Sequence, residues 1–158
     1  MVMMKEENIV CSSINIKNLA DQIILELVNG IKDADHTITH GKPGILIALA
    51  YYSSFSLNPE YEKIVDDAIQ QCIDDILNDI ETKHLDSSLA FGLAGVSYAL
   101  QTAYKLNQKD KIDPEWLEDL DVLLAESAQH FLDISDFDFF RGASGIITYM
   151  LQFYPNDE

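Results

Sequence analysis

The residue types that most often carry chemistry, cysteine and histidine, are few in this chain and widely separated. The two cysteines are Cys11 and Cys72, and neither stands in a Cys-x-x-Cys or Cys-His pair. Zinc sites are usually built from such closely spaced ligands. His36, His84 and His130 lie far apart, with no cysteine or carboxylate spacing that would let them share a metal ion. The sequence therefore predicts no metal site and no cofactor within this chain.

The net charge and the start of the chain indicate which partners and which cellular location to expect. The 158 residues carry a formal net charge of −17 at pH 7, which argues against nucleic acid because phosphate binding needs a basic surface. A cationic peptide is compatible with this charge, although acidity also simply keeps proteins in solution. No run approaches the roughly 18 apolar residues that span a bilayer, so we expect no membrane insertion. The start of the chain has acids where a secretory signal is basic, which predicts a cytoplasmic protein.

Six of the seven glycines form three pairs with the same internal spacing. They are Gly41 with Gly44, Gly92 with Gly95, and Gly142 with Gly145. The first members of successive pairs are 51 and then 50 residues apart, and a fixed period of this length indicates a repeat architecture. Glycine lets a chain turn sharply and approach its neighbours closely. Free amides that bind an anion are the alternative function of such turns, but three copies favour architecture.

The segments around these turns predict two kinds of helix. Residues 45–52, 96–104 and 146–153 follow the glycine pairs and carry almost no charge, so we expect helices buried over most of their circumference. Between them, apolar residues from Ile64 to Ile80 recur at helical spacing, with acids on the opposite face. Cysteine on such an apolar stripe behaves as a small hydrophobe.

Start signals mark the amphipathic helices. Asn58 can cap free amides and Pro59 can take the first helical position; Asp113 and Pro114 repeat this signal. These caps place the start of each amphipathic helix shortly after a polar loop.

The whole pattern predicts an all-α fold. An earlier amphipathic helix is expected over about 17–29, ended by Gly30. No segment alternates with period two for long enough to indicate a sheet. Each unit is an amphipathic helix, a loop, a Gly-x-x-Gly turn and a buried helix. Such units build a two-layered helical ring or solenoid, with the apolar helices inside and the acidic-faced helices outside.

The turns themselves resemble those of a known family. Phe-Gly-Leu-Ala-Gly-Val at 91–96, and Phe-Asp-Phe-Phe-Arg-Gly-Ala-Ser-Gly-Ile at 137–146, are similar to repeat turns of the lanthionine synthetase C-like cyclases. His-Gly-Lys-Pro-Gly-Ile at 40–45 resembles the first turn of that family. The resemblance covers about residues 19–153, and three turns in order at this spacing make it fairly specific.

The resemblance implies a partial α/α toroid, with about three inner and outer helix pairs of a six- to seven-pair ring. It divides the chain into an N-terminal segment, 1–15, expected to be flexible, and the N-terminal half of a toroid, 16–158. Members of the family use zinc to hold a peptide cysteine as a thiolate, which adds to a dehydrated serine or threonine and closes a thioether ring. Their zinc ligands come from later repeats, in Trp-Cys and Cys-His-Gly contexts that this chain lacks.

The resemblance also assigns candidate site residues. The family has an aspartate four residues before the first glycine of the third turn, implicated in proton transfer at the mouth of the central cavity, and Asp138 stands there. Capping of the turn is the alternative role for Asp138. His40 and Arg141, each directly before a glycine, are weaker substrate-binding candidates; a turn residue and a salt-bridge partner of Asp138 are their alternatives.

Three function classes follow from these observations. The first is the N-terminal part of a zinc-dependent cyclase, inactive alone, and the second is a non-catalytic module that binds a peptide or scaffolds a partner. The third, an α/α-toroid carbohydrate or terpenoid enzyme, needs inward-facing carboxylates, whereas the acids here fall on outer faces. A half ring would leave the helix over 143–154 with an exposed apolar strip. We therefore expect self-association, poor solubility or a missing C-terminal half.

Overall fold

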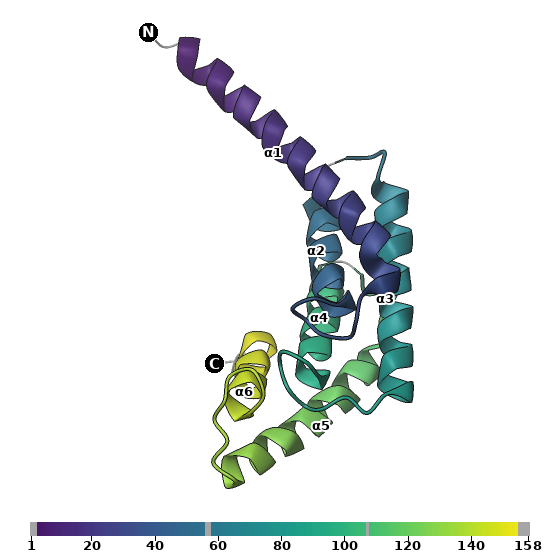
Figure 1. The fold of residues 1–158 in the computed structure, drawn as a ribbon, viewed down its shortest axis with the longest axis vertical. Helices are drawn as coiled ribbons and strands as arrows, with labels where there is room; N and C mark the ends of the chain where they lie inside the picture. Colours follow the sequence, from purple (N-terminus) through teal and green to yellow (C-terminus); the bar gives the residue numbers. More distant parts are fainter. Residues whose placement is uncertain (1–2, 56–57, 107, 155–158) are drawn as a thin grey trace.

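The computed structural model describes the backbone of residues 3–55, 58–106 and 108–154, and the side-chain surroundings from residue 16 onward within these ranges. Six α-helices and one 3-10 helix follow one another along the chain, and the described residues contain no strand. The elements are α1 (Met3–Gly30), η1 (Ile31–Asp33), α2 (Lys42–Phe55), α3 (Glu62–Thr82), α4 (Leu93–Lys105), α5 (Pro114–Asp133) and α6 (Ala143–Phe153) (Figure 1). The predicted all-α fold is confirmed.

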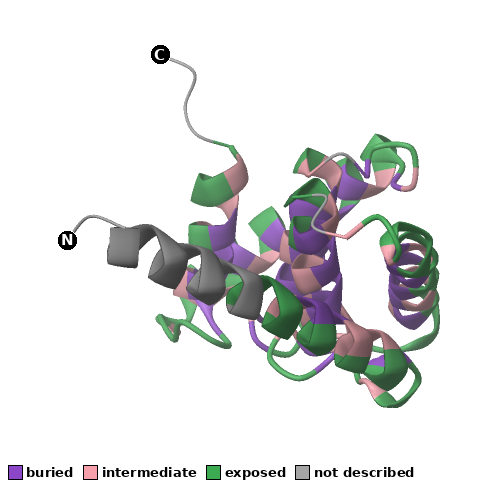
Figure 2. Ribbon diagram, turned by 90° about the horizontal axis from the view of Figure 1, so that it is seen from above, coloured by how far each residue is buried: buried purple, intermediate pink, exposed green. Residues whose placement is uncertain are grey.

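The helices that follow the glycine pairs form a row. α4 lies between α2 and α6 and packs against both (Figure 1). α3 packs chiefly against α2, and α5 packs against both α4 and α6. Figure 2 shows buried residues gathered where these helices face one another. The row α2, α4, α6 is therefore the inner layer, and α3 and α5 belong to the outer layer.

The inner helices are buried to the degree that their uncharged sequences predict. α4 is the most enclosed, with nine of its residues buried, because neighbours cover both of its flanks. The larger core cluster joins α2, α3 and α4, and includes Leu46, Ile69 and Leu100 at 0 % exposure. A second cluster lies between α5 and α6 and the start of α4, around Leu124 and Tyr149. The outer helix α3 buries its apolar stripe and leaves Asp66, Asp67 and Asp74 exposed, among others.

The start of α5 agrees with the prediction from the sequence, whereas the start of α3 does not. Asp113 is the N-cap of α5, where its side chain accepts a hydrogen bond from the N–H of Glu115 at 3.0 Å, and Pro114 follows it. The expectation that Asn58 caps α3 is wrong, because α3 begins only at Glu62. Asn58 instead accepts from the N–H of Glu60 at 3.1 Å within a turn that precedes the helix.

The first helix is longer than its apolar pattern predicts. α1 begins at Met3 rather than near Lys17, and it ends at Gly30 as expected. The surroundings of the side chains of residues 1–15 lie outside the described part, so the separate flexible segment expected there stays a prediction. Tyr52 of α2 donates a hydrogen bond to Asp21, which ties the later half of α1 to the inner row. In the described residues, no helix combines the length and apolar character needed to cross a membrane.

Candidate functional site

The three Gly-x-x-Gly turns share one local geometry, set by an aspartate six residues before the first glycine. Asp35, Asp86 and Asp136 occupy this position, and each carboxylate accepts from the N–H two residues later, at 2.8, 2.9 and 3.1 Å. The backbone oxygen of each aspartate also accepts from the residue after the glycine, at 2.8, 2.7 and 3.0 Å. These aspartates were not among the residues predicted from the sequence, although they repeat with the same 51- and 50-residue steps as the glycines.

The carboxyl group of the first of these aspartates is held ionised by its surroundings. Burial acts to raise the pKa of Asp35, but hydrogen bonds from the hydroxyl and the N–H of Thr37 act to lower it. The nearby His36 and His40 act in the same direction, and the pKa ends below its ordinary value. An ionised carboxylate accepts stronger hydrogen bonds than a neutral one, so this arrangement stabilises the turn.

The glycines are needed for space, since no described glycine has a positive φ. A Cβ at Gly41, Gly92 or Gly142 would overlap the backbone oxygen of the aspartate described above. At the second glycine of each pair it would overlap another carbonyl, and at Gly95 and Gly145 it would also meet a side chain of the preceding turn. The expected close approach is therefore the physical reason for glycine here.

Backbone hydrogen bonds join the three turns into a row at the N-terminal ends of the inner helices. The N–H of Ile38 in the first turn donates to the oxygen of Ala90 in the second, at 3.2 Å. The N–H of Ala90 donates in turn to the oxygen of Phe140 in the third, at 3.0 Å. Residues about 50 positions apart in sequence are thus neighbours along one edge of the molecule.

Asp138 caps the third turn. Its Oδ1 accepts from the N–H groups of Phe140 and Arg141, at 2.8 and 2.7 Å. Thr37 and Ser88 hold the same position in the other turns, and each uses its hydroxyl oxygen to accept the N–H three residues later, at 3.2 Å. A hydroxyl is therefore enough for the cap, and the exposed carboxylate of Asp138 adds a charge that the turn itself does not require.

The other two candidates have partners of their own. The guanidinium of Arg141 lies over the ring of Phe91 in the second turn, 5.3 Å from its centroid, and no ion pair joins it to Asp138 within the described residues. His40 lies in the first turn, where its Nδ1 is 2.9 Å from the hydroxyl of Thr39. The structure thus brings Asp138 and Arg141 together in one turn, and the second turn separates them from His40.

A comparison with protein-family profiles matches residues 32–158 to the family described as lanthionine synthetase C-like protein. The chain belongs to the lanthionine synthetase C-like family. A search of the curated proteins finds no match. The family fold is an α/α toroid, and the inner and outer helices described above are consistent with a partial one.

Full-length lanthionine synthetase C-like proteins are expected to bind a zinc ion, but the described residues do not provide a set of ligands for it. They contain no group of three or more histidine, cysteine or acidic side chains that could hold a metal ion. Cys72, on the inward face of α3, is fully buried, and burial followed by the charge of Asp75 raises the pKa of its thiol to about 12. A zinc ligand must be a thiolate, so this cysteine is a packing residue.

This burial makes a direct prediction about Cys72. In a Cys11→Ser variant, the single remaining thiol should not react with a disulfide reagent at neutral pH, because it is neither exposed nor ionised. Full reaction is expected only after denaturant is added, and absorbance of the released thiolate follows both stages. A thiol that reacted at the native stage as fast as free cysteine would contradict this placement.

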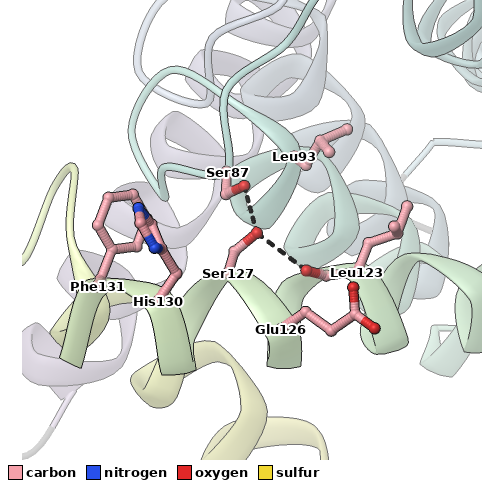
Figure 3. Close-up of a pocket in the computed structure, with 7 residues that line it drawn as sticks. All are labelled: Ser87, Leu93, Leu123, Glu126, Ser127, His130 and Phe131. Carbon is pink, nitrogen blue, oxygen red and sulfur yellow. Dashed lines mark hydrogen bonds between the residues drawn. The ribbon is translucent and has the colours of Figure 1, made fainter. Parts of the chain in front are cut away.

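One pocket of this lanthionine synthetase C-like chain combines residue types found in hydrolases (Figure 3). It has a volume of about 370 Å³, lies between α5 and the second turn, and includes Ser127, Glu126 and His130. The hydroxyl of Ser127 donates to the oxygen of Leu123 at 2.9 Å and lies 2.7 Å from the hydroxyl of Ser87. Among the hydrogen bonds of the described residues none joins Ser127 to His130, whereas an activated serine nucleophile is hydrogen-bonded to its base.

Proposed function

We propose that this chain supplies part of the peptide-binding wall of a lanthionine synthetase C-like toroid, and that residues 16–158 form the N-terminal half of that ring. The observation that carries the proposal is the continuous row of three turns, joined by the hydrogen bonds from Ile38 to Ala90 and from Ala90 to Phe140. The family match over 32–158 supports it.

The substrate class that suits this row is a cationic peptide with a cysteine and a dehydrated serine or threonine. In thioether formation the cysteine sulfur bonds to the β-carbon of the dehydrated residue, the double bond is lost, and the thiol proton is balanced by a proton delivered to the α-carbon. We assign the proton transfer to Asp138, whose Oδ1 is fixed by two N–H groups. Both hydrogen bonds that its carboxylate accepts from the described residues are on Oδ1. The net charge of −17 favours a cationic peptide.

We further propose that the chain alone binds the peptide without closing rings, because its sequence lacks the Trp-Cys and Cys-His-Gly motifs of the family. Ring closure leaves the mass of the peptide unchanged and consumes one thiol, so alkylation before mass spectrometry counts it. Saturable binding with no thiol consumption is the expected result. Stoichiometric zinc binding by this chain together with thiol consumption would contradict the proposal.

The equivalent residue of the second turn suggests an informative substitution of Asp138. Asp138→Ser reproduces Ser88 of the second turn, so the cap should persist and the free energy of unfolding should stay within about 0.5 kcal/mol of wild type. Asp138→Ala removes the cap and should cost about 1 kcal/mol. If the carboxylate faces the peptide, Asp138→Ser should weaken binding by about 1.4- to fivefold, since an exposed ion pair contributes about 0.2–1 kcal/mol. Fluorescence anisotropy of a labelled linear peptide measures this.

A matched control separates this local effect from overall charge. Asp119→Ser removes the same charge from the exposed face of α5 and should leave peptide binding nearly unchanged. Equal weakening by both variants would mean that only net charge attracts the peptide. Binding that is unaffected by Asp138→Ser would favour the second candidate function, a non-catalytic scaffold in which Asp138 only caps its turn.

A further inference from the structure

The pocket between the second turn and α5 is a candidate binding site that the proposed function does not use (Figure 3). Its volume of about 370 Å³ is within the range of small-molecule sites, roughly 300–1,000 Å³. Ser87 and Leu93 form one wall, and side chains from residues 123–131 of α5 form the other. Both walls therefore belong to elements in the middle of the chain, and α5 packs against α4 beside them.

A small side chain in the second turn contributes to this open space. By the steps of 51 and 50 residues, Ser87 corresponds to His36 in the first turn and to Phe137 in the third. Both of these equivalents carry rings, whereas Ser87 ends at a hydroxyl group beside Ser127. The small side chain at this position is therefore particular to the second turn.

The two hydroxyl groups of the pocket can offer only acceptors to a ligand. Ser127 donates its single hydroxyl proton to the backbone oxygen of Leu123, at 2.9 Å. In the 2.7 Å contact between the hydroxyls of Ser127 and Ser87, Ser87 must therefore be the donor. Because both protons are used within the protein, the remaining lone pairs of the Ser87 oxygen can accept a hydrogen bond from a ligand N–H.

The rest of the lining combines one negative charge with apolar surface. Glu126 is the one acidic residue among the lining residues, and it is exposed. The side chains of Leu93 and Leu123 add apolar surface. The rings of His130 and Phe131, with centroids 6.0 Å apart, lie at the opposite end of the pocket from Glu126 (Figure 3). Hydrogen-bond acceptors and a carboxylate beside apolar walls suit a cation that carries an apolar group.

We propose that this pocket binds a primary ammonium group carried on an apolar stem or ring. The ammonium group donates to the Ser87 oxygen and lies beside the Glu126 carboxylate, and the apolar part packs against Leu93 and Phe131. A carboxylate ligand of the same shape is repelled by Glu126 and by the net charge of −17. The same chemistry is present in a free amine and in the lysine side chain of a peptide.

Titration of the isotope-labelled chain with phenethylammonium, followed by NMR, tests this site. The amide signals around Ser87 and Ser127 should shift saturably, with a Kd on the order of 1 mM, as expected for a ligand of this size. Phenylpropionate has the same ring and a similar length but carries a carboxylate. It should produce no saturable shift at the same concentrations.

Substitutions of the lining place the amine within the pocket. Ser87→Phe introduces the residue type of Phe137, the equivalent position, and should fill the space and abolish saturable binding. Ser87→Ala keeps the space but removes the acceptor, and should weaken binding by about tenfold or more, as for a hydrogen bond to a charged group. Glu126→Gln should weaken binding by about 1.4- to fivefold, as for an exposed ion pair.

A matched control separates the pocket from the overall charge. Asp67→Asn removes one exposed charge from α3, outside the pocket, and should leave the Kd of the amine unchanged. Circular dichroism melting should show that each variant remains folded.

The labelled linear peptide distinguishes the two sources of the ammonium group. If the pocket takes a lysine side chain of the peptide, Ser87→Phe should weaken peptide binding, and phenethylammonium should compete with the peptide. If the ligand is a free amine, the affinity for the peptide should be the same in wild type and in Ser87→Phe.

Three results would overturn the proposal. The first is a wild-type chain whose signals show no saturable shift with about 10 mM phenethylammonium. The second is phenylpropionate binding as tightly as the amine, which would show that the charge of the ligand is not recognised. The third is unchanged amine binding in a folded Ser87→Phe variant, which would place the amine elsewhere on the protein. The amine titration involves no peptide, so its failure is distinguishable from a failure of peptide binding.

Discussion

Replacing Gly95 with alanine is expected to lower the free energy of unfolding by about 3–5 kcal/mol, which is at the upper end for a single substitution. The new Cβ would overlap the backbone oxygen of Leu89 and come within 3.3 Å of the Cβ of Ile38. A backbone carbonyl cannot rotate away as a flexible side chain can, so the turn itself must move. The same turn carries the hydrogen bonds of Ala90 to both neighbouring turns, and α4 is the inner helix flanked on both sides.

Gly30→Ala is the matched control for this substitution. Gly30 has helical backbone angles, and nothing lies within 4 Å of an added Cβ. Alanine should stabilise the protein there by about 0.4–1 kcal/mol, because it restricts the unfolded chain. Urea denaturation followed by circular dichroism measures both variants. A Gly95→Ala protein as stable as wild type would show that these turns do not pack as tightly as described.

Replacing Asp121 with alanine should cost about 2–4 kcal/mol, because one carboxylate on α5 holds several partners together. It accepts hydrogen bonds from the hydroxyls of Tyr149 and Tyr154, and the amide of Gln101 lies 3.5 Å from the same group. Burial, and then the hydrogen bond to Asp121, raises the pKa of Tyr149 above its ordinary value, so this hydroxyl keeps its proton and donates it. Since Tyr149 is fully buried, loss of Asp121 leaves the proton of its hydroxyl without the acceptor that it has in wild type.

A double-mutant comparison separates this unpaired hydroxyl from other effects. In a Tyr149→Phe background the buried hydroxyl is absent, so Asp121→Ala should cost about 1–3 kcal/mol less than it does in wild type. Asp119→Ala, an exposed acid on the same helix, should change the free energy of unfolding by no more than about 0.5 kcal/mol. Equal costs in both backgrounds would rule out the proposed role of the Tyr149 hydroxyl.

The sequence predicted the helices and the repeat because these depend on local and periodic signals. Uncharged segments after each glycine pair became α2, α4 and α6, and the cap at Asp113 began α5 as expected. The same kind of signal misplaced the start of α3. Asn58 instead hydrogen-bonds Asp21 of α1, at 3.1 Å, besides capping its own turn. A side-chain partner 37 residues away leaves no local pattern that a reader of the sequence could recognise.

The residues of the candidate site show where the tertiary structure decided what the sequence left open. The sequence supplied Asp138, Arg141 and His40 as candidates, together with the alternative that Asp138 caps its turn. Only the folded turns show that Thr37 and Ser88 make the same cap with hydroxyls, and that Arg141 lies over Phe91. Hydrophobic periodicity determines which face of a helix is buried, but the choice of neighbour across a 50-residue step depends on how the helices pack. For that reason the sequence determined the repeating unit, and the packing of the units determined the row of turns.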